Sequence, residues 1–221
     1  MSHGQPPEKP TVDPWPAPEV GRRPVIGLLG APGSGKSHYA AALAAQGAEV
    51  IDADAIAREL LQSPEVRDAL VERWSGSILG PDGQVDRAAV GRRVFDDPQE
   101  LAALEALIHP RVNRRRRELR EQLQQRPGVR AIVEDCPLLL ERGLAGDCDL
   151  LAWVETPRAV RLQRVIEGRG WDAAELDRRE KNQWSLDRKR RQADYILPGE
   201  AGPSEVARQA RSLLDQAAPK G

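Results

Sequence analysis

The chain has few aromatic residues, no excess of either charge and no long apolar run. Phe, Trp and Tyr together make up 4% of the 221 residues, which leaves little for a surface that stacks nucleic-acid bases. The 33 basic and 34 acidic residues give a formal net charge of -1, so neither nucleic acid nor an anionic membrane is favoured as a partner. No apolar run approaches the roughly 18 residues that a membrane span needs, and we therefore expect a soluble protein.

Cysteine is also scarce. Cys136 and Cys148 are the two cysteines of the chain, and their spacing does not match a metal site. The sequence shows no secretory signal peptide. We therefore expect two reduced thiols in a cytoplasmic protein.

The N-terminal region differs in composition from the rest. Residues 1–23 are rich in proline with interspersed charges, a composition that cannot build a packed core and predicts a disordered tail. Trp15 is the one residue of this tail that could pack on the body. From residue 24 onward the length suits one α/β domain with a small helical insertion.

Short apolar runs alternate with helical patterns from residue 24 onward. We expect strands at 25–29, 49–51, 129–134, 150–154 and 195–197. Helices are expected at 36–46, in succession over 55–125, near 138–145, and at 157–168, 173–192 and from 204. This alternation predicts a three-layer α/β fold with a mostly parallel five-stranded sheet, in which ligands bind at the carboxyl ends of the strands.

A glycine-rich loop follows the first expected strand. Residues Gly30 to Ser37 read Gly-Ala-Pro-Gly-Ser-Gly-Lys-Ser, which matches the G-x-x-x-x-G-K-[ST] pattern in its required strand–helix context. Backbone amides of Gly30, Gly33, Ser34 and Gly35 would surround phosphate oxygens at the start of the helix. Lys36 would add a positive charge at the β- and γ-phosphates, and Ser37 would bind Mg²⁺. Because no guanine-reading N-K-x-D tetrapeptide occurs, we expect an ATP-dependent kinase or an ATPase.

Acidic residues follow two other expected strands. Asp52 and Asp54 come directly after the second strand, where a carboxylate could accept a proton from an acceptor hydroxyl. Spacing alone leaves a second interpretation equally open, in which Asp54 caps the next helix. Asp135 ends the third strand and is the candidate Mg²⁺ ligand, with Glu134 as a competitor on the opposite face.

Arginine is concentrated in two places. Residues 161–179 hold five arginines in helices that could close over ATP, and we expect one or two of them to reach the phosphates. The second group lies at 111–120, with Glu118 and Glu121 nearby. A solvated, salt-bridged helix is the favoured interpretation of this run, over a nucleic-acid-binding stripe. His109, which precedes the run, is interpreted as structural on residue type alone.

The motifs occur in an order that resembles the dephospho-CoA kinase family over about residues 24–197. The resemblance rests on the phosphate loop, Val50–Asp54 with Ala57-Arg58, Arg93-Val94-Phe95, Leu107–Pro110, Asp135–Glu141, Leu162–Arg164, Arg169, Gln183, Lys189 and Ala193–Ile196. It implies transfer of the γ-phosphoryl group of ATP to the ribose 3′-hydroxyl of dephospho-CoA, with Mg²⁺. Asp54 then stands at the position of the catalytic base, and Arg164 at that of a lid arginine facing the phosphates.

The resemblance also implies a division of the chain and a set of acceptor contacts. Arg58, His109, Pro137 and Leu138 fall on positions associated with the acceptor. Residues 63–125 correspond to an acceptor-binding insertion and 168–192 to a lid, on a nucleotide-binding core of 24–62, 126–167 and 193–221. A monomer or weak homo-oligomer is expected. A kinase of another small acceptor, such as a nucleoside or nucleotide, and an inactive nucleotide-binding regulator stay open as alternatives.

The sequence departs from the family pattern in three places. Ala31-Pro32 replace Gly-Ile in the phosphate loop, and His38 stands where Thr is usual; we still count His38 among the nucleotide-binding residues. Residues 196–200 replace an Ile-Asp-Asn-x-Gly segment near the adenine, so adenine contacts there stay open. The segment from Thr156 to Arg164 is one residue longer than usual, which leaves Arg161 as an alternative to Arg164.

Overall fold

A computed structural model describes residues 21–95 and 97–218, so most of the predicted tail, with Trp15, lies outside the described residues. Five parallel strands form one sheet in the order β2-β3-β1-β4-β5. Their bounds are β1 Val25–Gly30, β2 Ala48–Asp52, β3 Ala131–Asp135, β4 Leu150–Glu155 and β5 Tyr195–Pro198. Each lies within two residues of its predicted position, and the parallel sheet is confirmed.

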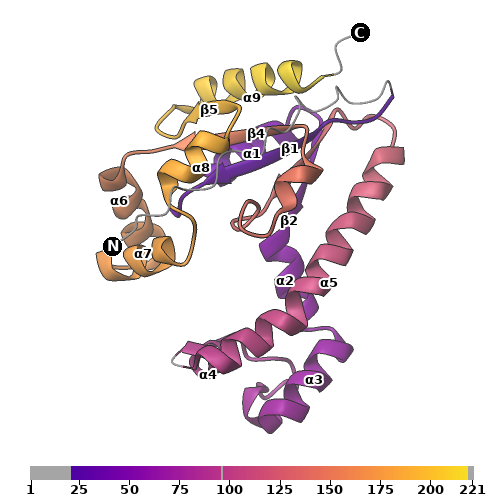
Figure 1. Cartoon of the computed structure of the whole chain (residues 1–221), viewed down its shortest axis with the longest axis vertical. Coiled ribbons are helices and arrows are strands. Elements are labelled where there is room, and N and C mark those ends of the chain that lie inside the picture. The colour runs from indigo at the N-terminus through magenta and orange to yellow at the C-terminus, as the bar shows by residue number, and fades with distance from the viewer. Residues whose placement is uncertain (1–20, 96, 219–221) are drawn as a thin grey trace, which may run out of the picture.

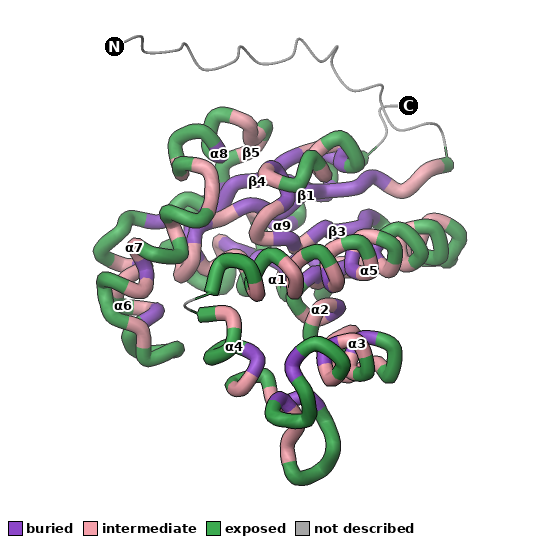
Figure 2. Tube along the Cα trace, turned by 60° about the horizontal axis from the view of Figure 1, so that its bottom comes forward, coloured by how far each residue is buried: buried purple, intermediate pink, exposed green. Residues whose placement is uncertain are grey.

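Helices cover both faces of the sheet (Figure 1). On one face, α1 (Lys36–Ala44) and α9 (Pro203–Ala217) pack against alternate strand residues such as Ile26 and Val133. On the other face, α5 (Pro98–Gln125) and the segment before α8 (Leu186–Gln192) cover residues such as Val25 and Ile132. The strands are therefore buried on both sides, as their nearly continuous apolar sequences require, and Figure 2 shows the burial concentrated there.

The remaining helices lie beyond the ends of the strands. α2 (Ala53–Leu61), α3 (Pro64–Trp74), the short helix η1 (Ser75–Ile78) and α4 (Arg87–Phe95) lead away from the end of β2. α6 (Arg158–Arg169) and α7 (Ala173–Lys181) follow β4 and form a separate pair of helices. Within residues 21–95 and 97–218, no helix combines the length and the apolar character needed to cross a membrane.

Two predictions of local structure were wrong. The expected helix at 173–192 is two helices, because Ser185 caps a new helix by accepting a hydrogen bond from the Arg188 amide at 3.3 Å. The expected helix near 138–145 is a series of turns ending in the short helix η2 (Leu144–Asp147). His109 and Pro110 lie inside α5, which continues through the proline.

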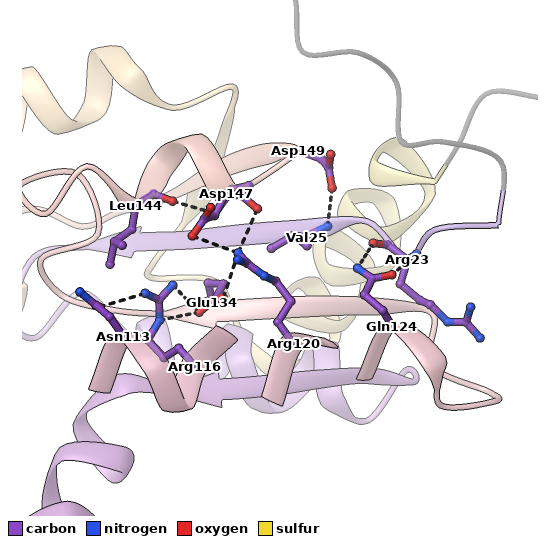
Figure 3. Close-up of polar contacts among 11 residues, drawn as sticks. Arg23, Val25, Asn113, Arg116, Arg120, Gln124, Glu134, Leu144, Asp147 and Asp149 are labelled. Atoms are coloured by element: carbon purple, nitrogen blue, oxygen red, sulfur yellow. Dashed lines mark hydrogen bonds and ion pairs between the residues drawn. The ribbon is translucent and has the colours of Figure 1, made fainter. Parts of the chain in front are cut away.

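The arginine run at 111–120 is not simply solvated. Arg114 and Arg117 are exposed as expected, but Arg116 is buried and donates to Glu134 on β3. Arg120 lies 3.1 Å from Asp147 and 3.8 Å from the other Glu134 oxygen (Figure 3). The run instead provides the polar contacts that fasten the C-terminal half of α5 to the sheet.

Candidate active site

The phosphate loop begins at the end of the central strand β1. Gly33 and Gly35 have φ angles of 78° and 90°, in the left-handed region that favours glycine. The Ser34 amide donates to the Ala31 carbonyl at 3.0 Å, and α1 begins at Lys36. Alternation of left-handed and right-handed residues turns successive amides toward one concave side, where they can bind an anion. The loop therefore has the geometry that its sequence predicts.

Two side chains from other elements hold the outer side of this loop. The Thr156 hydroxyl, just after β4, donates to the Ser34 carbonyl at 2.7 Å. The Arg164 guanidinium on α6 donates to the same carbonyl at 3.3 Å and to the Gly199 carbonyl at 2.9 Å. Because these donors bind carbonyl groups on the outside, the loop amides stay available on the inside.

The two candidate lid arginines have different surroundings, although Arg161 also lies 3.5 Å from the Pro32 carbonyl of the loop. Arg161 is 4% exposed, forms an ion pair with Glu180 and donates to the Thr156 carbonyl at 3.1 Å. Arg164 is only partly buried and lies at the phosphate loop. Arg161 thus joins α6 to α7, whereas Arg164 is placed where it could turn toward a phosphate.

Lys36 points from the loop to the end of β3. Its ammonium group forms an ion pair with the Asp135 carboxylate, and 18% and 13% of the two side chains are exposed. Burial lowers the pKa of Lys36, while the charges of Asp54 and Asp52 act in the opposite direction. The lysine and three carboxylates therefore share one region at the carboxyl ends of β1, β2 and β3.

Glu134 and Asp135 project to opposite faces of the sheet, as the period of a strand requires. Glu134 is buried against Arg116, on the face of the sheet that α5 covers. Burial raises the pKa of Glu134, and the charge of Arg116 opposes that effect. Asp135 faces Lys36. Glu134 therefore lies away from the phosphate loop, and Asp135 is the carboxylate of β3 that a metal ion there could reach.

Asp52, not Asp54, caps α2. The Asp52 carboxylate accepts a hydrogen bond from the Ala55 amide at 2.9 Å and lies 3.6 Å from Arg58. Asp54 sits in the first turn of α2 with an exposed side chain. Within residues 21–95 and 97–218 it makes no hydrogen bond or ion pair, so its carboxylate is available to a ligand. The capping interpretation of Asp54 was wrong, because the helix begins at Ala53.

The residues predicted for the acceptor lie on separate elements. Arg58 is exposed on α2, and Pro137 and Leu138 form the turn after β3. His109 is on α5, where its Nε2 atom lies 3.0 Å from the Arg142 guanidinium. Pro137 and Leu138 follow Asp135 by two and three residues in the chain. The structure shows no direct contact from His109 to the phosphate loop.

The oxygen ligands near Lys36 suit Mg²⁺. The hydroxyl-bearing residue Ser37 is exposed in the first turn of α1, and Asp135 lies opposite. Mg²⁺ prefers oxygen ligands and commonly takes one or two from protein and the others from water and substrate phosphates. The described residues contain no cluster of three or more His, Cys, Asp and Glu side chains able to hold a metal by themselves.

Sequence reasoning missed Thr156 and Gly199. A Cβ atom added at Gly199 would lie 1.8 Å from the Thr156 hydroxyl oxygen and 2.5 Å from the Ser34 carbonyl oxygen, so only glycine fits against the loop. Thr156 comes directly after β4 and could have been found by examining every strand end. Gly199 carries no such signal, since its close contact depends on the packing of β5 beside β4.

The fold and the loop define a P-loop nucleotide-binding protein with a carboxylate-lined edge beside its phosphate site. A family model described as dephospho-CoA kinase matches residues 24–205. The chain belongs to the dephospho-CoA kinase family, and the family predicted from the ordered motifs is confirmed.

Individual relatives agree with the family model. The dephospho-CoA kinase of Thermobifida fusca is 39% identical over 183 residues, covering 82% of this chain and 90% of that protein. The dephospho-CoA kinase of Deinococcus radiodurans is 39% identical over 181 residues, covering 82% of this chain and 86% of that protein.

Two solved structures share the fold. TT1252 from Thermus thermophilus has a TM-score of 0.73 and 32% identity, and the match covers 88% of this chain and 98% of that one. The dephospho-CoA kinase from Campylobacter jejuni has a TM-score of 0.63 at 19% identity, and the match covers 90% of this chain and 99% of that one. At that identity the second likeness supports the fold alone.

Proposed function

We propose that this protein transfers the γ-phosphoryl group of ATP to the ribose 3′-hydroxyl of dephospho-CoA, giving CoA and ADP. The observation that carries the proposal is the Lys36–Asp135 pair at the mouth of a complete phosphate loop, in a chain that belongs to the dephospho-CoA kinase family. The enzyme is thus a phosphotransferase with an alcohol acceptor, and it uses ATP and Mg²⁺.

In this mechanism the loop binds and orients the nucleotide. Amides of Gly33 to Ser37 bind the phosphates, with His38 in the following turn, and Lys36 places a positive charge at the β- and γ-phosphates. Ser37 and Asp135 would hold Mg²⁺, which supplies positive charge to the oxygens of the transferred group. Arg164 would turn from the loop carbonyls toward the same oxygens as the charge moves.

Asp54 is the proposed base. Its exposed carboxylate follows β2, beside the strand that ends in Asp135, and it would accept the proton of the attacking 3′-hydroxyl. Arg58, His109, Pro137 and Leu138 would bind the acceptor. Residues 63–125 would form most of the acceptor-binding insertion and 168–192 a lid that closes over ATP. We further propose that the protein acts in the cytoplasm as a monomer or weak homo-oligomer.

An acceptor panel tests the proposal. ADP release would be measured with ATP and Mg²⁺ in the presence of dephospho-CoA, nucleosides, nucleotides or no acceptor. We expect release with dephospho-CoA and loss of it in Lys36→Ala, whereas Arg211→Ala, which removes an exposed positive charge of α9, keeps the wild-type rate. Preference for a nucleoside or nucleotide would identify a different kinase. Salt-dependent oligonucleotide binding without turnover would identify a regulator instead.

A further inference from the structure

Lys189 is a buried lysine with an acceptor for every one of its N–H groups. It lies on α8, is 1% exposed, and its Nζ atom is 2.8 Å from a Glu141 oxygen. The same atom donates to Gln183 Oε1 at 2.8 Å and to the Pro137 carbonyl at 3.0 Å. An ammonium group has three donors, so these contacts use its full capacity and fix its position.

The contacts join two segments that are distant in the sequence. Pro137 and Glu141 belong to the turns after β3, whereas Gln183 and Lys189 belong to the stretch that ends the proposed lid. The Trp184 amide also donates to Glu141, at 2.8 Å from the same oxygen that binds Lys189. The turns after β3 and the start of α8 are thereby held in one fixed arrangement.

This arrangement lies next to the active site. Pro137 comes two residues after Asp135, which pairs with Lys36. The Lys189 contact to the Pro137 carbonyl therefore constrains the backbone between Asp135 and Leu138. Packing alone does not explain a lysine at this position. A buried charge is costly, and an apolar side chain would fill the same space at a lower cost in free energy.

We propose that Lys189 is a positioning residue that holds the Pro137–Leu138 backbone in the conformation that binds dephospho-CoA. The proposal rests on the proposed function, because it takes Pro137 and Leu138 as acceptor contacts. It assigns Lys189 no contact with substrate; its effect passes through the Pro137 carbonyl. Loss of the lysine should therefore raise KM for dephospho-CoA more than KM for ATP, because Lys189 contacts the Pro137 carbonyl and not the phosphate loop.

The obvious variant has a complication. Lys189→Met alone would leave the Glu141 carboxylate without its ion-pair partner; its second oxygen, Oε2, is already shielded from solvent and accepts no hydrogen bond from residues 21–95 and 97–218. Breaking a buried pair from one side destabilises a fold strongly. The double variant Lys189→Met/Glu141→Gln removes both charges together and keeps an oxygen for the Trp184 amide.

Glu141→Gln alone is the control for breaking the ion pair: it leaves the buried Lys189 charge unpaired, with the loss of stability that this brings, but it keeps the contact of Lys189 with Pro137. KM for dephospho-CoA, KM for ATP, kcat and the thermal unfolding midpoint would be measured for wild type and both variants. We expect the double variant to raise KM for dephospho-CoA by about tenfold, the change in affinity that corresponds to the loss of one hydrogen bond from a charged group. KM for ATP should stay close to that of Glu141→Gln, and the unfolding midpoint should be no lower than that of Glu141→Gln, in which the buried Lys189 charge has lost its ion-pair partner.

Three outcomes would overturn the proposal. An unchanged KM for dephospho-CoA in the double variant would show that Lys189 does not position the acceptor segment. Equal increases in both KM values, or an effect as large in Glu141→Gln, would assign the cluster a purely structural role. Absence of dephospho-CoA-dependent ADP release in the wild-type protein is a different result, because it contradicts the proposed function before any variant is compared.

Discussion

The Arg116 guanidinium forms an ion pair with the Glu134 carboxylate, with Nε and Nη2 at 2.9 and 2.8 Å from one oxygen. Only 2% and 1% of the two side chains are exposed. The pair joins the middle of α5 to β3, and Figure 3 shows the Arg116 side chain pointing from the helix to Glu134. Asp135 is the next residue of that strand. The helix that begins in the proposed insertion is thus tied to the strand that delivers a carboxylate to the phosphate site.

This pair leads to a prediction about stability. Arg116→Met should destabilise the protein by about 3–5 kcal/mol, because it leaves the buried Glu134 charge without its main partner. Arg120, at 3.8 Å, offsets part of that loss. The double variant Arg116→Met/Glu134→Leu should recover most of the stability, since paired apolar side chains can replace a buried ion pair.

Urea unfolding at neutral pH would give the free energy of unfolding of the wild type, Arg116→Met and the double variant. Arg114→Met, which changes an exposed arginine two residues away on the same helix, is the control and should be close to wild type. A double variant as unstable as Arg116→Met would contradict the explanation based on an unpaired charge.

A second prediction separates the two carboxylates after β2. Asp54→Asn should lower kcat by about 10²–10⁴-fold, the usual contribution of a general base, while the unfolding midpoint stays near wild type because Asp54 is exposed. Asp52→Asn should keep most of the activity, since its amide oxygen can still accept the Ala55 amide and cap α2. The steady-state rate of ADP release with dephospho-CoA would be measured for both variants. Wild-type turnover in Asp54→Asn would remove the assignment of the base.

A third prediction concerns the close contact at Gly199. Gly199→Ala would force a methyl group into the Thr156 hydroxyl and the Ser34 carbonyl, so the phosphate loop must shift. We expect weaker binding of ADP with Mg²⁺ in calorimetry, together with a lower unfolding midpoint. Gly91→Ala in α4 is the control, because a Cβ atom there meets nothing within 4 Å and alanine favours helix. Equal affinity in Gly199→Ala and wild type would show that the loop does not depend on this contact.

The elements with a local signal could be predicted from the sequence. The phosphate loop could be predicted because the spacing of Gly30, Gly35 and Lys36 is typical of a loop whose backbone amides surround an anion. The strands were found because parallel strands buried on both faces are almost wholly apolar. Asp135 was placed correctly with respect to Glu134 by the period of a strand.

The misplaced features depend on contacts between distant segments. Arg116 is identical in type to its exposed neighbours, and only the position of Glu134 across the sheet determines that it is buried. The same holds for Lys189, whose acceptor at Pro137 is 52 residues away. The sequence left open that Asp54 caps α2, because sequence alone places the start of a helix only to within a residue or two.

The last prediction concerns His109, which is partly buried on α5 beside Arg142. Burial lowers the pKa of this imidazole, and the nearby Arg142 charge lowers it further, whereas Glu105 acts in the opposite direction. The folded state therefore favours the neutral ring more than the unfolded chain does. In the unfolded chain a histidine takes up a proton near its ordinary pKa of about 6.5.

The stability that His109 contributes should therefore be complete above about pH 6.5 and decline as the pH falls toward the lower pKa of the folded state. Urea unfolding of the wild type at pH 7.5 and 5.5 should show this loss, and His109→Gln should reduce it because the glutamine does not titrate. His38→Gln, at an exposed position of α1, is the matched control and should keep the wild-type dependence. If His109→Gln lost as much stability between the two pH values as the wild type, another group would be responsible for the titration.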